Sequence, residues 1–279
     1  MTSTDYRSES YANWQRVASS WERRREEMWL ATEQVSRNLV ERLRLRPGQT
    51  VLELAAGPGQ TGLLAAEAVG PAGRLIATDF APAMVDAARR LTRKLGVENV
   101  EHRVMDAEDI DLPDASVDAV LCRWGFMLFA NPARAFAETR RVLRHGGRLA
   151  VSVWAPPDAN PWAAVVGRAV VAHGAMPPPD PAAPGMFYLA EPERIETLVR
   201  AASFESIDIE DVPVAFTYDS FDDYWTTTLE LGAGIANALA PLPAEERDQI
   251  RADVERAAAP YRTADGYEFP GLCHNVLAR

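Results

Sequence analysis

The chain has 279 residues, of which 47% are hydrophobic and 25% charged, an ordinary balance for a globular protein. Its 29 Lys and Arg against 40 Asp and Glu give a formal net charge of −11, which argues against a nucleic-acid partner because phosphate binding needs clustered basic side chains. The two cysteines, Cys122 and Cys273, have neither metal-ligand nor disulfide spacing, so we expect no metal site. The sequence has no apolar run near the roughly 20 residues that cross a bilayer and no signal-peptide pattern, which predicts a cytoplasmic protein without a membrane span.

The first half of the chain alternates helical and strand patterns. Apolar residues recur at helical spacing over residues 10–45, a segment stopped by Pro47-Gly48. Short apolar runs then predict five strands, at residues 51–56, 74–79, 98–106, 116–124 and 148–154. Helical patterns separate several of them, at residues 61–69, 81–95 and 132–143. This alternation predicts an α/β fold with a parallel, doubly wound sheet.

The pattern changes after Ala155. The stretch 176–185 holds five prolines in ten residues and is expected to form an irregular loop or the edge of a lid. The remaining expected elements are helices at 162–171 and 191–204, a strand at 205–218, helical segments over 221–259 with a break near 241–243, and a last strand at 272–278.

A glycine-rich turn, GPGQTG, links the expected strand at 51–56 to the expected helix at 61–69 and forms a G-x-G-x-x-G pattern. Glycines let backbone amides approach a ligand at the helix N-terminus, and Asp79 at the end of the second strand can accept ribose hydroxyls. Both a dinucleotide and S-adenosylmethionine exploit this geometry, so the pattern alone leaves the cofactor open. Glu53 lies on the buried strand before the turn, and because an unpaired buried carboxylate is costly, a role at a ligand cation or amine is favoured.

The segment from Glu53 to Gly59, ELAAGPG, resembles motif I of the class I S-adenosylmethionine-dependent methyltransferases, with Ala55 in place of the usual first glycine. ATDFAPAMVDAAR resembles the second motif of this family, and VMDAEDIDLPDASVDAVLC resembles the third and fourth. The resemblance covers residues 47–155 strongly and residues 185–279 by order of elements only. Within the family, the chain is similar to the quinone-biosynthesis C-methyltransferases.

The resemblance implies a Rossmann-like, seven-stranded, mostly parallel sheet whose antiparallel last strand is inserted beside strand six. It also implies three parts: an N-terminal helical cap at 1–46, the cofactor-binding core at 47–155, and lid helices with strands that complete the same sheet at 156–279. The expected cofactor is S-adenosyl-L-methionine, with Asp79 on the ribose, Met84 on the adenine and Asp106 on its amine. Met84 has an equally ordinary alternative role in the helix core. The complete set of expected cofactor residues is Glu53, Ala55, Gly57, Gly59, Asp79, Phe80, Met84, Asp106, Ala107 and Cys122.

The expected reaction is an in-line displacement, in which the protein aligns acceptor and methyl group and excludes water. Residues after strand four usually line the acceptor site of this family, and here they read Cys-Arg-Trp-Gly-Phe-Met without the Asn- or Asp-Pro-Pro-aromatic clamp of nucleobase and glutamine methylation. We therefore expect a small, largely apolar acceptor. The candidate acceptor or lid residues are Tyr11, Trp14, Trp21, Trp124 and Phe126. For the N-terminal aromatics, ordinary helix packing is an equal alternative.

No catalytic signature is present, and the general base stays unknown. His173, His274 and Arg123 are weak candidates, although Arg123 could instead pair with a surface acid. Two other functions remain open: an NAD(P)-dependent oxidoreductase, which lacks a recognisable hydride-transfer constellation here, and a cofactor-binding protein without activity. The sequence does not indicate whether O, N, C or S is methylated, or the oligomeric state.

Overall fold

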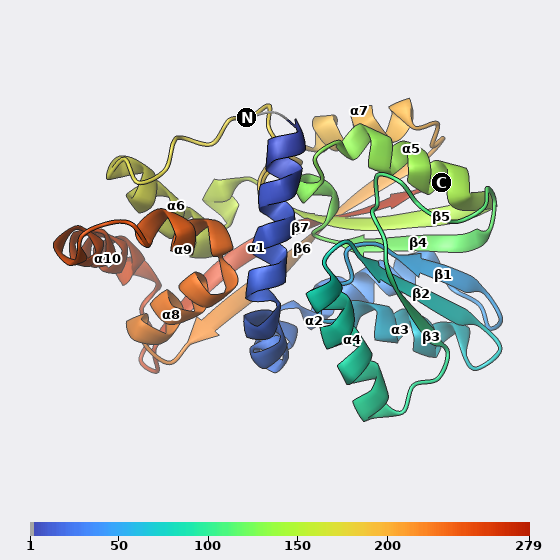
Figure 1. Ribbon diagram of the computed structural model, residues 1–279, viewed down its shortest axis with the longest axis horizontal. Coiled ribbons are helices and arrows are strands. Elements are labelled where there is room, and N and C mark those ends of the chain that lie inside the picture. The colour runs from blue at the N-terminus through green and yellow to red at the C-terminus, as the bar shows by residue number, and fades with distance from the viewer. Residues whose placement is uncertain (1–2) are drawn as a thin grey trace.

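The computed structural model describes residues 3–279, which build one seven-stranded sheet flanked by helices (Figure 1). The strands lie in the order β3-β2-β1-β4-β5-β7-β6. Their bounds are β1 (Thr50–Glu53), β2 (Arg74–Asp79), β3 (Val100–Val104), β4 (Val117–Arg123), β5 (Leu143–Trp154), β6 (Ile207–Tyr218) and β7 (Tyr267–Ala278). Strands β1 to β5 pair in parallel, whereas β7 is antiparallel to both β5 and β6. The predicted Rossmann-like sheet with its inserted antiparallel last strand is confirmed.

Helices cover both faces of the sheet, as Figure 1 shows. One face carries α2 (Arg25–Leu43), α3 (Gln60–Val69) and α4 (Pro82–Leu95), and the other carries α5 (Pro132–Val142) and α7 (Pro192–Ala201). Consecutive strand residues point to opposite faces, so Val51 joins the apolar layer under α2 and α3 while Leu52 joins the larger layer on the other side. Both layers hold buried aliphatic side chains, as expected for parallel strands covered on both sides, and the larger layer also contains aromatic rings.

The remaining helices form a group beyond the ends of β6 and β7. They are α6 (Pro161–Ala172), α8 (Phe221–Leu231), α9 (Ala233–Leu239) and α10 (Ala244–Ala258). Helix α1 (Ser3–Arg23) runs between this group and the sheet, beside α4 on one side and α8 and α9 on the other (Figure 1). The indole of Trp21 donates to the Leu231 carbonyl at 3.3 Å, and Glu22 accepts from Arg90 of α4 at 2.8 Å. Helix α1 therefore connects the core to the helical group.

Several element bounds differ from the sequence prediction. The expected helix at 10–45 is two helices, α1 and α2, which meet at Arg24, where the backbone leaves helical geometry and the side chain pairs with Glu230 of α8 at 2.5 Å. Strand β5 starts at Leu143 instead of Arg148, because Leu143 pairs with Val117 across an irregularity in the ladder. The segment 221–259 is also broken at Gly232, between α8 and α9.

Strand β7 begins at Tyr267 instead of Leu272, because it pairs with β6 along its whole length. Within the described residues 3–279, no helix combines the length and the apolar character needed to span a membrane.

Candidate active site

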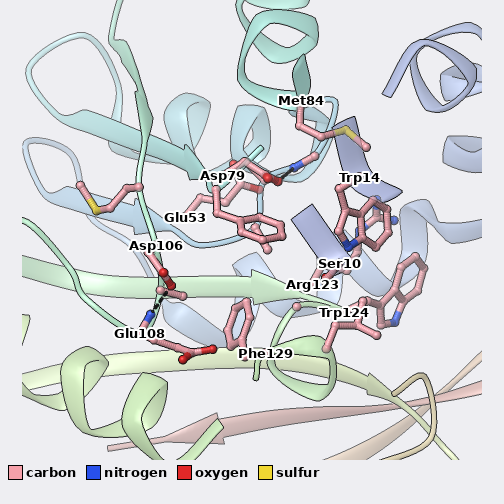
Figure 2. Close-up of a pocket in the computed structure, with 18 of the residues that line it drawn as sticks. Ser10, Trp14, Glu53, Asp79, Met84, Asp106, Glu108, Arg123, Trp124 and Phe129 are labelled. Carbon is pink, nitrogen blue, oxygen red and sulfur yellow. Dashed lines mark hydrogen bonds between the residues drawn. The ribbon is translucent and has the colours of Figure 1, made fainter. Parts of the chain in front are cut away.

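A cavity opens at the C-terminal ends of β1, β2 and β4, with helix α1 along its mouth (Figure 2). It encloses about 1000 Å³, counted out to its open mouth. In Figure 2 the carboxylates of Glu53, Asp79, Asp106 and Glu108 lie to the left, while Trp14, Arg123 and Trp124 lie to the right. Twelve of the residues named from the sequence line it: Trp14, Trp21, Glu53, Ala55, Gly57, Asp79, Phe80, Met84, Asp106, Ala107, Arg123 and Trp124.

The turn between β1 and α3 is built around left-handed backbone. Gly57 and Gly59 have φ of 55° and 89°, and Ala55 takes φ of 51° despite its side chain. A Cβ on Gly59 would lie 2.8 Å from the Ala88 Cβ of α4, so this glycine permits close packing of the two helices. Non-glycine residues in this conformation carry strain of order 1 kcal/mol, which is common at functional sites.

The third glycine of the G-x-G-x-x-G pattern is explained by Glu53. A Cβ on Gly62 would collide with the carboxylate of Glu53 and would lie 2.7 Å from the Leu75 side chain. Gly62 therefore makes room for the carboxylate. In this chain, two features that first suggested different cofactors, the glycine pattern and the preceding acid, are parts of one packing arrangement.

Glu53 is 2% exposed, and its Oε2 has no hydrogen-bond partner among the described residues. Burial raises the pKa of this carboxyl from 4.5 to about 8, against the opposing influence of the Arg123 charge. A buried carboxyl with an orphaned oxygen at a cavity wall is a site where a ligand donor would be bound.

Asp79 ends β2 and holds the glycine turn in place. Its Oδ2 accepts from the Gly57 amide at 3.0 Å, and its Oδ1 accepts from the Ala81 amide at 2.9 Å. Burial raises the pKa of Asp79 from 3.8 to about 6, while these backbone donors oppose the rise. Each oxygen retains a lone pair, so the carboxylate can accept further hydrogen bonds from hydroxyls in the cavity.

The left end of the cavity in Figure 2 is closed by charges that α1 brings to the chain segment after β3. Arg7 pairs with Asp106 and, at 3.0 Å, with Glu108. The Tyr6 hydroxyl donates to the Leu128 carbonyl at 3.0 Å, and burial raises the pKa of Tyr6 to about 12. Glu108 also accepts from the Asn131 amide at 3.0 Å. The N-terminal turns of α1 thus cap the region around Asp106.

Arg123 and Trp124 follow β4 on the opposite side of the cavity. The guanidinium lies 4.3 Å from the centre of the Trp124 ring and donates to the Thr32 hydroxyl at 2.7 Å. Trp124 has φ of 61° and is, with Ala55, a second non-glycine residue of the cavity wall with left-handed backbone. The alternative in which Arg123 pairs with a surface acid is wrong, because its side chain donates to a hydroxyl on α2 and lines the cavity.

Six sequence candidates lie outside the cavity wall. Gly59 packs on α4, and Cys122 is fully buried behind the wall. Phe126 stacks on Phe136 at 4.1 Å inside the core. Tyr11 is 41% exposed on the outer side of α1, with its ring edge-on to Phe80.

The two histidine candidates also lie away from the cavity. His173 bonds Asp253 of α10 at 2.8 Å. His274 sits between the Asp211 carboxylate at 2.6 Å and the Ala190 carbonyl at 3.0 Å. Because both nitrogens of His274 face acceptors and neither histidine lines the cavity, their suggested role as general base is not supported.

The sequence reasoning missed Tyr6, Arg7, Ser10, Glu108 and Phe129, all of which line the cavity. Only Glu108 carried a local signal, since it follows Asp106 by two residues. The others are isolated residues whose place depends on how α1 and the segment after β4 fold over the strand ends.

A doubly wound sheet, a glycine turn after β1, an acid after β2 and a second acid after β3 form the arrangement that the resemblance to class I S-adenosylmethionine-dependent methyltransferases implies. Residues 51–147 match the family profile described as "Methyltransferase domain", as the sequence resemblance predicted. The cofactor that this domain implies is S-adenosyl-L-methionine.

Two curated relatives come from quinone biosynthesis. Demethylmenaquinone methyltransferase of Deinococcus radiodurans is 34% identical over 141 residues, which cover 46% of this chain and 57% of that protein. A ubiquinone/menaquinone biosynthesis C-methyltransferase of Hydrogenovibrio crunogenus is 36% identical over 116 residues, covering 41% of this chain and 46% of that protein. The chain thus spans about half the length of these relatives, and it resembles the quinone C-methyltransferases as predicted.

A likeness to solved structures extends over most of the chain. The YcgJ protein of Bacillus subtilis superimposes with a TM-score of 0.60 at 20% identity, covering 87% of this chain and 96% of that one. At this identity the likeness concerns the fold.

Proposed function

We propose that the protein transfers a methyl group from S-adenosylmethionine to a small, largely apolar acceptor bound in the same cavity. The observation that carries the proposal is the convergence of residues from three separate sequence motifs, among them Glu53, Asp79 and Asp106, on one cavity wall, opposite a wall of tryptophans. The match to a methyltransferase domain supports transfer chemistry over hydride transfer.

The residues present fit the cofactor. The Glu53 carboxylate in the cavity wall suits an ammonium donor, and the spare lone pairs of Asp79 suit ribose hydroxyls. Met84 is 1% exposed where it borders the cavity, beside the Phe80 ring, and provides an apolar surface for a base. Asp106 can accept a hydrogen bond from an exocyclic amine once Arg7 shares or releases the Asp106 carboxylate. When bound, the sulfonium cofactor supplies an already activated methyl group.

The chain's own part in the reaction is positioning and exclusion of water. Trp14, Trp21 and Trp124 surround the side of the cavity away from the acids, and their faces attract a nearby cation. Helix α1 covers the mouth. We assign no general base, and the acceptor atom stays undetermined.

We retain three further expectations as part of the proposal. For the division into a cap at 1–46, a core at 47–155 and lid helices with closing strands at 156–279, the position of α1 between core and helical group supports a cap, whereas α2 packs on the sheet as part of the core. A cytoplasmic location is supported by two buried, unpaired cysteines. The charge of −11 supports the absence of a nucleic-acid partner.

Thermal or chemical unfolding with and without ligands tests the proposal. S-adenosylhomocysteine at 100 times its dissociation constant should stabilise the protein by about 2.7 kcal/mol, while NAD(H) and NADP(H) should have no effect. Stabilisation by a dinucleotide alone would overturn the proposal. Release of S-adenosylhomocysteine in a screen of small acceptors then separates an enzyme from an inactive binder.

A further inference from the structure

Arg123 is held rigidly at the cavity wall. Its Nη1 donates to the Thr32 hydroxyl at 2.7 Å, and that hydroxyl, 1% exposed as a residue, donates onward to the Met28 carbonyl at 2.5 Å. The central carbon of the guanidinium lies over the Trp124 ring, 4.3 Å from its centre. Two different elements, α2 and the end of β4, therefore fix its position.

The ring under Arg123 is itself supported by a run of aromatic contacts. Trp124 stacks on Trp154 at 4.3 Å with an interplanar angle of 18°. Trp154 contacts Trp162 of α6 at 4.9 Å, and Trp162 contacts Phe216 of β6 at 4.6 Å. Because these rings are packed between β5, α6 and β6, the guanidinium rests on a stiff base and loses little entropy when it binds a partner.

The charge of Arg123 is not neutralised by direct contact. Among the described residues, Thr32 is the only hydrogen-bond partner of its side chain, and no carboxylate lies within ion-pairing distance. Two other poorly exposed arginines differ from it: Arg24 contacts three carboxylates, and Arg42 contacts two carboxylates and two backbone carbonyls. A guanidinium has five N–H donors, so Arg123 keeps most of its donors for the cavity that it lines.

Glu53 lies on the strand next to that of Arg123 and makes no ion pair with it. Burial lowers the Arg123 pKa to about 10, and a Glu53 carboxylate opposes that lowering, so the guanidinium is protonated at neutral pH. Both side chains line the cavity, and they lie farther apart than the 4.0 Å limit of an ion pair. This separation leaves space for a bound molecule to contact the guanidinium.

We infer that Arg123 is the anion-recognising residue of the cavity and holds a carboxylate or oxyanion of a bound molecule through paired N–H donors. The inference rests on the proposed function and adds a charge requirement to it. The same chemistry has two possible sources, the carboxylate of the cofactor's methionyl group and an anionic group on the acceptor. The planar fork of arginine matches both.

Calorimetric titration of Arg123→Gln and Arg123→Lys tests the inference with pairs of charged and neutral probes. S-adenosylhomocysteine is compared with 5′-methylthioadenosine, which lacks the carboxylate and ammonium. Benzoate is compared with benzamide on protein saturated with S-adenosylhomocysteine. Arg42→Gln, which removes an arginine of α2 outside the cavity, is the control for general damage and should leave all four affinities unchanged.

If the cofactor supplies the anion, Arg123→Gln lowers the affinity for S-adenosylhomocysteine by about tenfold or more and leaves the affinity for 5′-methylthioadenosine unchanged. If the acceptor supplies it, the affinities for both nucleosides stay unchanged, and only the affinity for benzoate falls, by a similar factor. Arg123→Lys should recover part of either loss, because charge remains while the fork is gone.

Two outcomes overturn the inference: equal losses for charged and neutral probes, or no loss for any of them. If no affinity falls, and if the double variant that combines Glu53→Gln with Arg123→Gln regains stability, Arg123 serves only as a counterion of Glu53. Failure of the wild-type protein to bind S-adenosylhomocysteine would instead overturn the proposed function, so the two failures are distinguishable.

Discussion

The two sides of the cavity are built in different ways. The acidic side consists of Glu53, Asp79 and Asp106, which end or follow three neighbouring strands of the sheet. The aromatic side combines Trp14 and Trp21 of α1 with Trp124 after β4, supported by rings from α6 and β6. The first side needs only short strand–turn segments, whereas the second needs elements from the whole chain.

This difference has an energetic counterpart. On the acidic side, buried carboxyls with few partners store unfavourable free energy, visible in the raised pKa values of Glu53 and Asp79. On the aromatic side, many ring contacts share the stabilisation. We therefore expect single substitutions to have large effects among the acids and their glycines, and small effects among the tryptophans.

The largest effect is expected for Gly62→Ala. Its new Cβ would meet the Glu53 carboxylate and the Leu75 side chain, neither of which can move without disturbing the core. We expect the free energy of unfolding to fall by about 3 kcal/mol, with loss of S-adenosylhomocysteine binding. Denaturant unfolding measures the first and calorimetry the second.

Gly167→Ala is the matched control for this substitution. Gly167 lies within α6, and a Cβ there would meet no atom within 4 Å. Because alanine favours a helix over glycine, this variant should be more stable by about 0.5–1 kcal/mol. Equal destabilisation by both variants would mean that the space beside Glu53 is not the cause.

The next largest effect concerns the pH dependence of Glu53→Gln. Burial raises the pKa of Asp79 to about 6 and that of Glu53 to about 8 in the folded protein. Between their ordinary values and these raised values, the folded state keeps protons that the unfolded chain has released. The unfolded state then binds fewer protons, so the stability of the ligand-free protein falls as pH rises from about 4 to about 8.

Glu53→Gln removes the share of this decline that Glu53 contributes, from about pH 4.5 to about 8, and leaves the share of Asp79, which ends near pH 6. At pH 8 the variant should be more stable than the wild type by on the order of 2–4 kcal/mol, while binding S-adenosylhomocysteine more weakly. Unfolding curves at a series of pH values measure the difference. Glu67→Gln, at an exposed carboxylate of α3, is the control, and a parallel decline in Glu53→Gln and wild type would contradict the assignment.

The acidic side is also the part that the sequence predicted best. Strand ends and the glycine turn are local features, and the match between motif order and strand order places Glu53, Asp79 and Asp106 on one edge of the sheet. Arg7 and Glu108 were not predicted as site residues, because their pairing depends on α1 crossing the strand ends. His274 was misjudged because β7 is buried on both faces, so its pattern does not indicate which face meets the cavity and which meets Asp211.

Asp79→Asn is expected to have an intermediate effect, on ligand affinity. The carboxylate accepts from the Gly57 and Ala81 amides, but an asparagine would oppose one of these donors with its own amide group. Affinity for S-adenosylhomocysteine should fall by about tenfold or more, measured by calorimetry. Asp86→Asn, at a carboxylate on α4 that pairs with Arg89, is the neighbouring control. Unchanged affinity in Asp79→Asn would refute its assignment to the ribose.

The smallest effect is expected for Trp21→Phe on the aromatic side. The substitution keeps a ring beside Trp14, whose centre lies 6.0 Å away, but removes the indole donor to the Leu231 carbonyl. We expect a loss of about 1 kcal/mol in the free energy of unfolding and a rise of roughly fivefold in hydrogen exchange of the α1 amides, since this bond joins α1 to α8.

Affinity for S-adenosylhomocysteine should change by no more than about twofold, because the acids and the glycine turn keep their geometry and α1 retains the Glu22–Arg90 contact with α4. Trp225→Phe, on α8 outside the cavity, controls for loss of indole area alone and should leave exchange in α1 unchanged. A destabilisation by Trp21→Phe as large as that of Gly62→Ala would contradict the distributed support of the aromatic side, and would make this one hydrogen bond the main attachment of α1 to the helical group.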